Sequence, residues 1–248
     1  MKRVLITAGA SGIGRATAEA FDAAGHEVCV TDVDAEALSK CPANWHTAVA
    51  DASNEQQVEQ AIEQFGPLDV LCANAGIAGP TGLVEEIDLN DWKKCVSVNL
   101  DGAFLAAKHT VPAMKAARSG AIILTSSTAG QYGYPHRAPY SAAKWAVIGL
   151  MKTLAMELGP FGIRANAICP GAVEGPRMEG VLAREAAAKK MTRDAVYQGY
   201  ARGTSMRRFV EAEDIANMAV FLASDAARLV SGQVIAVDGH TENPDPKI

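Results

Sequence analysis

A tyrosine and a lysine stand four positions apart in the stretch RAPYSAAKW, residues 137–145. Positions i and i+4 share one face of an α-helix, so we expect the Tyr140 phenol and the Lys144 ammonium to point the same way. A phenol with an ordinary pKa of about 10 is a poor general base near neutrality unless that pKa is lowered. An ammonium about 4 Å away contributes ~4 kcal/mol at an effective dielectric of about 20, enough to activate the phenol. The pair alone could also be a chance surface arrangement.

The rest of the chain alternates short β-rich runs with helical stretches. Strands are predicted at 3–7, 27–31, 45–50, 68–73, 121–126, 163–169 and 233–237, and helices near 12–24, 54–65, 91–117, 138–158 and 211–224. Continuously apolar strands that alternate with helices predict a parallel sheet covered on both faces. We therefore expect one α/β domain over residues 1–248, a doubly wound Rossmann-type sheet of about seven strands. The charged segment near 174–210 breaks the rhythm and predicts a helical insertion over an active site.

Composition excludes several classes of protein. The chain has 248 residues, half of them apolar, and a net charge of −5, which argues against a nucleic-acid or anionic-membrane partner. Its five cysteines have no CxxC spacing, and no His/Cys/Asp cluster has metal-ligand spacing, so we predict core cysteines, a cytoplasmic location and no metal. No apolar run approaches the ~18 residues of a membrane span.

A glycine-rich turn, TAGASGIG at 7–14, joins the first predicted strand to the first helix. Glycines allow a tight turn and bring the backbone close to a pyrophosphate at a helix N-terminus. The residues assigned to this cofactor contact are Gly9, Ser11, Gly12, Ile13 and Gly14. A plain loop is the alternative for such a turn taken alone, but its place between the first strand and the first helix favours the phosphate site.

Small or polar residues also follow the other predicted strands. Asp32 ends the second strand and can accept hydrogen bonds from both hydroxyls of an adenosine ribose, while it repels a 2′-phosphate. Its alternative role is the N-cap of a short helix at 34–39, which Asp34 can supply instead. The remaining strand ends carry Asp51, Asn74 with Gly76, Ser127, and the stretch CPGAV at 169–173. Each of these alone is compatible with a cap or turn, but together they predict a ligand site, because ligands bind at the carboxyl ends of such strands.

These motifs closely resemble the short-chain dehydrogenases/reductases, in their compact single-domain subgroup, over nearly the whole chain. The glycine turn, the Asn-Ala-Gly element, SVNLDG, the serine thirteen residues before the tyrosine, YSAAK and CPGAV have the order and spacing of that family. The resemblance implies that the catalytic residues are Asn99, Ser127, Tyr140 and Lys144. It implies further cofactor contacts at Asp51 and Ala52 (adenine), at Asn74, Ala75 and Gly76 (ribose), and at Tyr140, Lys144, Pro170, Gly171 and Val173.

Two positions depart from the family pattern. Ala8 replaces the first glycine of the turn, and its side chain would cost about 1–2 kcal/mol in the left-handed region. We therefore expect a functional turn of slightly altered shape. Gly175 stands where the family often has a threonine near the cofactor's carboxamide, so this contact is expected to fall to backbone groups near Val173.

The predicted function is NAD-dependent interconversion of a small secondary alcohol, of the polyol, sugar or hydroxy-acid type, and its carbonyl, with Tyr140 as general base or acid. Two alternatives are a nucleotide-sensing or scaffold protein without chemistry, and a lyase or epimerase that uses the cofactor transiently. The family suggests a homo-oligomer, a tetramer.

Candidate substrate contacts are Ser127, Tyr134 and Arg177. Residues 174–208 carry eight cationic side chains against four acidic ones, and Arg177 is the nearest of them to the end of the sixth strand. A guanidinium there suits an anionic substrate. Solvated helix faces and subunit contacts are the alternative for this charge run, and a solvated loop is the alternative for Tyr134.

Overall fold

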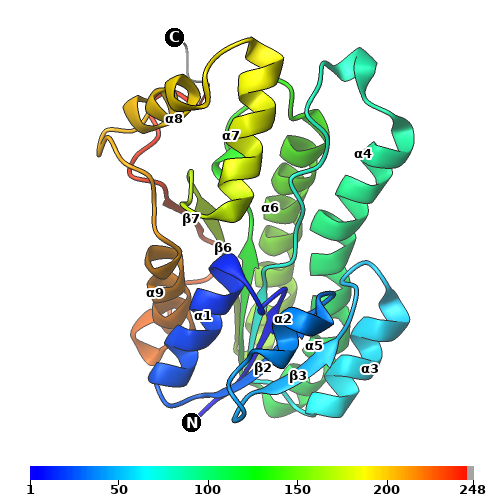
Figure 1. The fold of residues 1–248 in the computed structure, drawn as a ribbon. Helices are drawn as coiled ribbons and strands as arrows, with labels where there is room; N and C mark the ends of the chain where they lie inside the picture. Colours follow the sequence, from blue (N-terminus) through cyan, green and yellow to red (C-terminus); the bar gives the residue numbers. More distant parts are fainter. Residues whose placement is uncertain (245–248) are drawn as a thin grey trace.

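The computed structural model describes residues 1–244 as a parallel sheet between two helical layers (Figure 1). The sheet has the order β3-β2-β1-β4-β5-β6-β7, and every neighbouring pair is parallel. The strands are β1 (Arg3–Thr7), β2 (Glu27–Asp32), β3 (His46–Val49), β4 (Val70–Ala73), β5 (Gly120–Thr125), β6 (Ile163–Pro170) and β7 (Val234–Val237). This order confirms the predicted doubly wound fold, with its topological switch point between β1 and β4.

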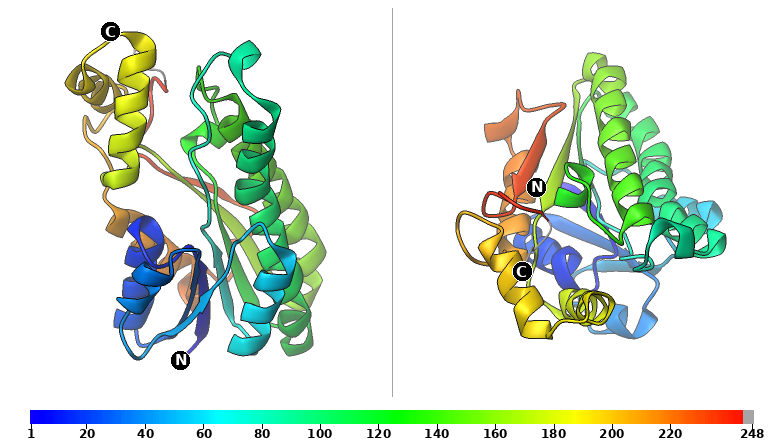
Figure 2. Two further views of the ribbon diagram at one scale, coloured as in Figure 1. Left: turned by 45° about the vertical axis from the view of Figure 1, so that its right-hand side comes forward. Right: turned by 90° about the horizontal axis from the view of Figure 1, so that it is seen from above.

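Helices cover both faces of the sheet. They are α1 (Gly12–Ala23), α2 (Ala35–Ser39), α3 (Glu55–Phe65), α4 (Leu89–Val96), α5 (Gly102–Ala117), α6 (Ala138–Leu158), α7 (Pro176–Lys189), α8 (Arg193–Arg202) and α9 (Ala212–Ala223). Helices α1 and α9 pack together on one face, while α5 and α6 lie on the other (Figure 2). None of the helices in the described residues is long and apolar enough to cross a membrane.

The apolar side chains of β1 show why its sequence does not alternate with polar residues. Val4 and Ile6 pack with Phe21 of α1 in the core on the α1–α9 face, whereas Leu5 packs in the opposite core with Met114 of α5. Successive side chains of a strand point to opposite faces, so a strand covered on both faces must be apolar at every position.

The segment after β6 folds into α7 and α8, which lie beyond the carboxyl ends of the strands (Figures 1 and 2). The two helices share a small core of their own, built around Leu182, Val196 and Phe209. A separate core of this kind allows the pair to sit above the sheet without adding to either of its main faces.

The long helix predicted over 91–117 is divided in the structure, and this corrects the prediction. Helix α4 runs into a π-helical turn at Ser97–Asp101, and α5 continues from Gly102. A π turn widens the backbone by one residue and is often found at functional sites. It is this wide turn that holds Asn99, buried at 1% exposure.

Candidate active site

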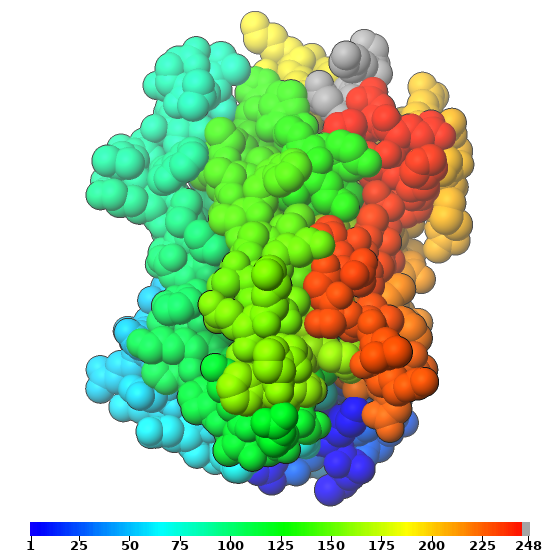
Figure 3. Space-filling model, turned by 180° about the vertical axis from the view of Figure 1, so that it is seen from behind, coloured from blue at the N-terminus to red at the C-terminus, as the bar shows by residue number. Residues whose placement is uncertain are grey.

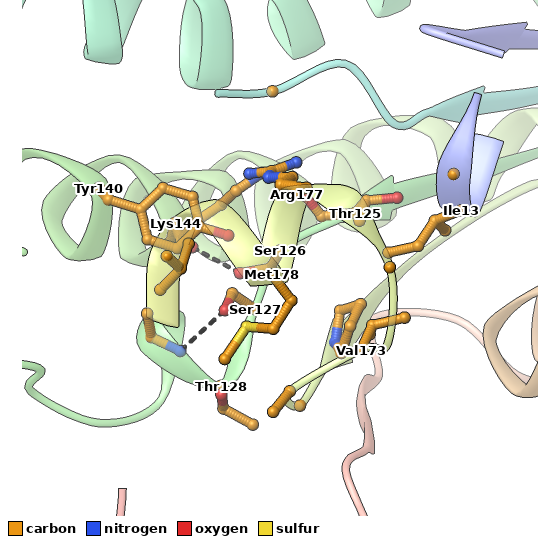
Figure 4. A pocket seen from close by; sticks show the side chains of 18 of the residues that line it. Ile13, Thr125, Ser126, Ser127, Thr128, Tyr140, Lys144, Val173, Arg177 and Met178 are labelled. Carbon is orange, nitrogen blue, oxygen red and sulfur yellow. Dashed lines mark hydrogen bonds between the residues drawn. The ribbon is translucent and has the colours of Figure 1, made fainter. Parts of the chain in front are cut away.

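A cavity of about 300 Å³ lies at the carboxyl ends of the central strands, beside α7 (Figure 4). Most of the predicted site residues line it: Ser11, Gly12, Ile13, Asn74, Gly76, Ser127, Tyr134, Tyr140, Lys144, Pro170, Gly171, Val173 and Arg177. The predicted residues outside its lining are Gly9, Gly14, Asp32, Asp51, Ala52, Ala75 and Asn99. The carboxyl ends of the central strands therefore meet at one cavity, as expected for a parallel sheet built from alternating strands and helices.

Tyr140 and Lys144 share one face of α6 at the cavity wall. The Lys144 Nζ atom lies 5.8 Å from the centroid of the Tyr140 ring and donates a hydrogen bond to the Thr125 carbonyl at 2.8 Å. Only 2% of Lys144 is exposed, and burial lowers its pKa against the opposing effect of Tyr140. The opening motif is therefore an inward-facing pair rather than a surface one.

Several groups set the pKa of the Tyr140 phenol. Burial raises this pKa, but the positive charges of Arg177, Lys144 and Arg137, in that order, lower it, and so does a hydrogen bond with Ser127. The net result is a pKa below the ordinary value of 10.0. Lys144 is thus one of three cations that act on the phenol.

Two serines at the end of β5 form different contacts, one with α6 and one with the turn that follows β5. Ser126 Oγ donates to the Lys144 carbonyl at 2.7 Å, and Ser127 caps a 3₁₀ turn by accepting from the Ala129 amide at 3.1 Å (Figure 4). A Cβ atom at Gly130 would lie 2.4 Å from Ser126 Oγ, so this contact requires a glycine. Sequence reasoning placed Ser127 here and gave no role to Ser126, whose partner is a backbone atom that no motif reveals.

Asn99 reaches the site from the π turn without lining the cavity. Its Nδ2 atom donates to the carbonyls of Ile77 and Cys95, both at 2.9 Å, and its buried Oδ1 accepts no hydrogen bond within residues 1–244. A Cβ atom at Gly76 would lie 2.5 Å from that Oδ1 and 3.3 Å from Lys144 Nζ. Gly76 therefore keeps side-chain atoms out of the space next to both polar groups.

The glycine turn is tied to β4 across the switch point. Thr7 Oγ1 accepts from the amides of Asn74 and Ala75, both at 3.0 Å, and Asn74 Nδ2 donates to the Ala8 carbonyl at 3.3 Å. A Cβ atom at Gly14 would lie 2.1 Å from that carbonyl oxygen, so only glycine fits. Thr7 belongs to the quoted motif, but its bracing role depends on β1 and β4 being neighbours.

The acidic strand ends take different local roles. The Asp32 carboxylate accepts from the Ala10 and Asp34 amides, each at 3.1 Å, and Asp34 supplies the cap of α2 by accepting from Ala37. Asp32 is therefore not the cap of α2, and it borders the glycine turn. Asp51 accepts from the Ser53 amide and hydroxyl, and α3 is capped by Asn54.

Ala8 occupies the left-handed region with a φ of 51°. We expect Ala8→Gly to stabilise the protein by roughly 0.5–1 kcal/mol. The substitution removes the ~1–2 kcal/mol steric cost of the left-handed backbone, but glycine also raises the entropy of the unfolded chain, which offsets part of this gain. For a domain of this size that raises Tm by about 1–3 °C. Thermal unfolding followed by circular dichroism measures it.

Ala10→Gly is the matched control, since Ala10 lies two residues away and outside the left-handed region. It should lower Tm, because it adds chain entropy without relieving strain. A lower Tm for Ala8→Gly as well would show that the turn carries no steric strain at this alanine.

A doubly wound sheet with a glycine turn at its switch point and a Tyr–Lys pair at its strand ends defines a Rossmann-type oxidoreductase. A family model described as Enoyl-(Acyl carrier protein) reductase matches residues 7–240. The chain is 38% identical, over 96% of its length and 92% of the relative's, to a trans-4-hydroxycyclohexanecarboxylate dehydrogenase from Sinomonas cyclohexanicum. This chain belongs to the short-chain dehydrogenase/reductase family, whose members use a nicotinamide cofactor.

Solved structures give the same result. The chain superimposes on levodione reductase with a TM-score of 0.89 at 35% identity, covering 96% of both chains. It superimposes on an NAD⁺-bound xylitol dehydrogenase with a TM-score of 0.91 at 28% identity, covering 96% of this chain and 98% of the other. The resemblance predicted from the motifs is confirmed.

Proposed function

We propose that this protein is an NAD-dependent dehydrogenase that interconverts a small secondary alcohol and its carbonyl, with Tyr140 as general base and acid. The observation that carries the proposal is the position of the Tyr140 phenol at the cavity wall, where Lys144, Arg137 and Arg177 all lie within about 6 Å of its ring. Relatives named as a hydroxycyclohexanecarboxylate dehydrogenase, a levodione reductase and a xylitol dehydrogenase support the same class of reaction.

The residues divide the chemistry among them. Ser127 holds the substrate oxygen, and Tyr140 takes the hydroxyl proton as the carbinol hydrogen leaves as hydride. Lys144 and the neighbouring guanidinium groups stabilise the phenolate that accepts the proton. Asn99, with its unpartnered Oδ1 next to Gly76, is proposed to hold a water that links Lys144 to solvent. In the reverse direction the Tyr140 hydroxyl donates the proton to the carbonyl.

The residues present fit a nicotinamide dinucleotide, which supplies the hydride acceptor when bound. The N-terminal end of α1, with Ser11, Gly12 and Ile13, lines the cavity, and Gly14 excludes a side chain where the backbone must come close. Asp32 is proposed for the ribose hydroxyls, Asp51 and Ala52 for the adenine, and Asn74 to Gly76 for the second contact with that ribose. The residues at the end of β6, Pro170, Gly171 and Val173, are proposed to lie against the nicotinamide.

The backbone of Val173 is suited to the contact with the cofactor's carboxamide that we expect near Gly175. The Val173–Val210 bridge uses the carbonyl of Ala172 and the amide of Glu174, so it leaves the amide and carbonyl of Val173 itself without a backbone partner within residues 1–244. Val173 lines the cavity. Its peptide groups therefore suit the two polar ends of a carboxamide.

We also propose that α7 and α8 cover the bound substrate, because Arg177, Met178 and Val181 of α7 and Tyr200 of α8 line the cavity.

Self-association of the protein is proposed as well. Apolar side chains on the face formed by α5 and α6 are exposed, namely Phe104, Trp145 and Met156, and Figure 3 shows this face in green. Light scattering measures the oligomeric state directly.

Cofactor choice gives a sharp test of the Asp32 role. We expect NAD to exceed NADP in kcat/KM, because the carboxylate binds ribose hydroxyls and repels a 2′-phosphate. Arg15, the nearest cation to the turn, pairs with Glu19 at 2.6 Å and lies over Trp45, so it is already engaged. Asp32→Ala should reduce the NAD/NADP ratio at least tenfold, about 1.4 kcal/mol. Steady-state kinetics with both cofactors measures the ratio.

Asp34→Ala is the control, because it removes a carboxylate two residues away that caps α2. Its ratio should stay near that of the wild type. Equal use of NAD and NADP by the unmodified protein would contradict the assignment of Asp32. A protein that binds NAD but forms no NADH with any alcohol, hydroxy acid or sugar would instead support the sensor alternative.

A further inference from the structure

Two guanidinium groups lie close to the ring of the catalytic phenol. The Arg137 Cζ atom is 4.8 Å from the Tyr140 ring centroid, and the Arg177 Cζ atom is 6.0 Å from it. Arg137 is the residue before α6, and Arg177 lies in the first turn of α7, so separate elements bring them together. Both line the cavity, and Figure 4 shows Arg177 beside Tyr140.

Neither guanidinium has a carboxylate partner within residues 1–244. Arg137 donates from Nη2 to the Ala78 carbonyl at 3.3 Å, and its Nε is buried without a hydrogen-bond partner. Arg177 is exposed and forms no ion pair with a described residue. Together with Lys144, the two arginines place three positive charges on one wall of the cavity. A bound anion would stabilise this arrangement of like charges.

The acidic groups nearby do not neutralise this wall. Glu174 is the one carboxylate in the lining contributed by residues 1–244, and it accepts a hydrogen bond from the Tyr197 hydroxyl at 2.7 Å. Glu185 of α7 does not line the cavity; it accepts a hydrogen bond from the Tyr200 hydroxyl at 2.6 Å and pairs with Lys189 at 2.9 Å. The cavity therefore keeps an excess of positive charge.

Other cations of the same segment are accounted for differently. Arg193 pairs with Glu179, and Arg207 pairs with Glu242. Arg184 is exposed on α7 and does not line the cavity. Of the eight cations between 174 and 208, Arg177 is the one that the structure places in the lining, which separates it from the general surface charge of the segment.

We propose that Arg137 and Arg177 bind a carboxylate of the substrate, so that the alcohol oxidised by this protein is a hydroxy acid. The inference rests on the proposed dehydrogenase function and names its substrate class. Guanidinium groups bind carboxylates through two parallel N–H···O bonds, and the unpartnered Nε–H of Arg137 shows that contacts within residues 1–244 do not satisfy all the donors of this group.

The site also couples charge recognition to the chemistry. The groups that face Tyr140 are Lys144 from α6, Arg137 from the position just before α6, Arg177 from α7, and Ser127 after β5. A carboxylate bound by the two arginines offsets their effect on the phenol, and so raises its pKa in the complex with substrate. The pH at which kcat rises should then be higher with a hydroxy acid than with its neutral ester.

The test compares acids with their methyl esters in NAD-linked oxidation. The probes are 3-hydroxybutyrate and trans-4-hydroxycyclohexanecarboxylate, each beside its methyl ester. We expect kcat/KM for at least one acid to exceed that of its ester by about 100-fold or more, and Arg137→Met or Arg177→Met to reduce this acid-to-ester ratio at least tenfold, about 1.4 kcal/mol each. Arg184→Met, the same change one cation further along α7, should leave the ratio unchanged.

A binding measurement separates this site from the proposed activity. Calorimetry with cyclohexanecarboxylate and the protein–NADH complex should give a Kd that each arginine variant weakens at least tenfold, roughly 1.4 kcal/mol, while methyl cyclohexanecarboxylate binds weakly to all. Oxidation of the esters as fast as the acids, or an acid-to-ester ratio insensitive to both variants, overturns the carboxylate site and leaves the dehydrogenase function standing. Arginine-dependent binding without oxidation of any alcohol supports the site and overturns the function. Absence of both binding and acid oxidation overturns the site.

Discussion

Replacing Tyr140 with phenylalanine is expected to lower kcat for alcohol oxidation by about 10²–10⁴, the usual contribution of general acid–base catalysis. The substitution removes the only proton acceptor proposed for the substrate hydroxyl and keeps the ring, which lies near both Arg137 and Arg177. Steady-state kinetics with the best alcohol measures the loss.

Tyr132→Phe is the matched control, because it removes a phenol hydroxyl outside the cavity that donates to the Thr241 carbonyl at 3.4 Å. This variant should keep kcat near the wild-type value. NADH binding, followed by fluorescence titration, should change little in Tyr140→Phe. A Tyr140→Phe protein that keeps more than about a tenth of wild-type kcat would exclude Tyr140 as the general base, since so small a loss lies below the range of acid–base catalysis.

The fold could be predicted because each strand of this sheet is covered on both faces. Leu5 and Ile6 enter opposite cores, so β1 reads as an uninterrupted apolar run, and the same pattern marks the other central strands. Alternation of such runs with helices then leaves few topologies, and the doubly wound order is the common one. The strand ends, which carry Asp32, Asn74 and Ser127, followed directly from that order.

Features that depend on tertiary contacts could not be predicted in this way. Nothing in the sequence of the helix expected over 91–117 marks the extra residue of the π turn that carries Asn99. The left-handed backbone of Ala8 is set by the turn between β1 and α1 rather than by a preference of alanine. Arg137 approaches Tyr140 from three residues before it, a spacing that permits contact, but only the folded loop decides whether the side chain turns inward.

The electrostatics of the site show the same limit. The i, i+4 spacing singled out Lys144 as the charge that lowers the pKa of the phenol. In the structure Arg177, 6.0 Å from the ring centroid, has the larger effect, and Arg137 adds to it. At about 6 Å and an effective dielectric of about 20, a single charge contributes ~3 kcal/mol before solvent screening, so none of the three is negligible. Arg177 lies 37 positions from Tyr140 in the sequence and reaches it only because α7 folds over the end of the sheet.

Lys144→Met should therefore shift the pH dependence of oxidation without abolishing it. Activity rises as the Tyr140 phenol loses its proton, and loss of one positive charge raises the pKa of that phenol. The rising limb of kcat/KM is expected to move toward higher pH by about one unit or more, and activity at neutral pH to fall at least tenfold. The remaining charges on Arg137 and Arg177 keep the phenol partly activated. A pH profile of kcat/KM measures both effects.

The direction of the shift separates the electrostatic role of Lys144 from its proposed contact with the cofactor. Weaker NAD binding alone would lower kcat/KM equally at every pH, whereas loss of the charge recovers activity in alkaline buffer. Lys152→Met, two turns further along α6 on an exposed position, removes the same charge away from the cavity and should leave the profile in place. A rising limb that stays at the wild-type pH in Lys144→Met would mean that the two arginines set the pKa of Tyr140. Lys144 would then act only by binding the cofactor and by donating its hydrogen bond to the Thr125 carbonyl.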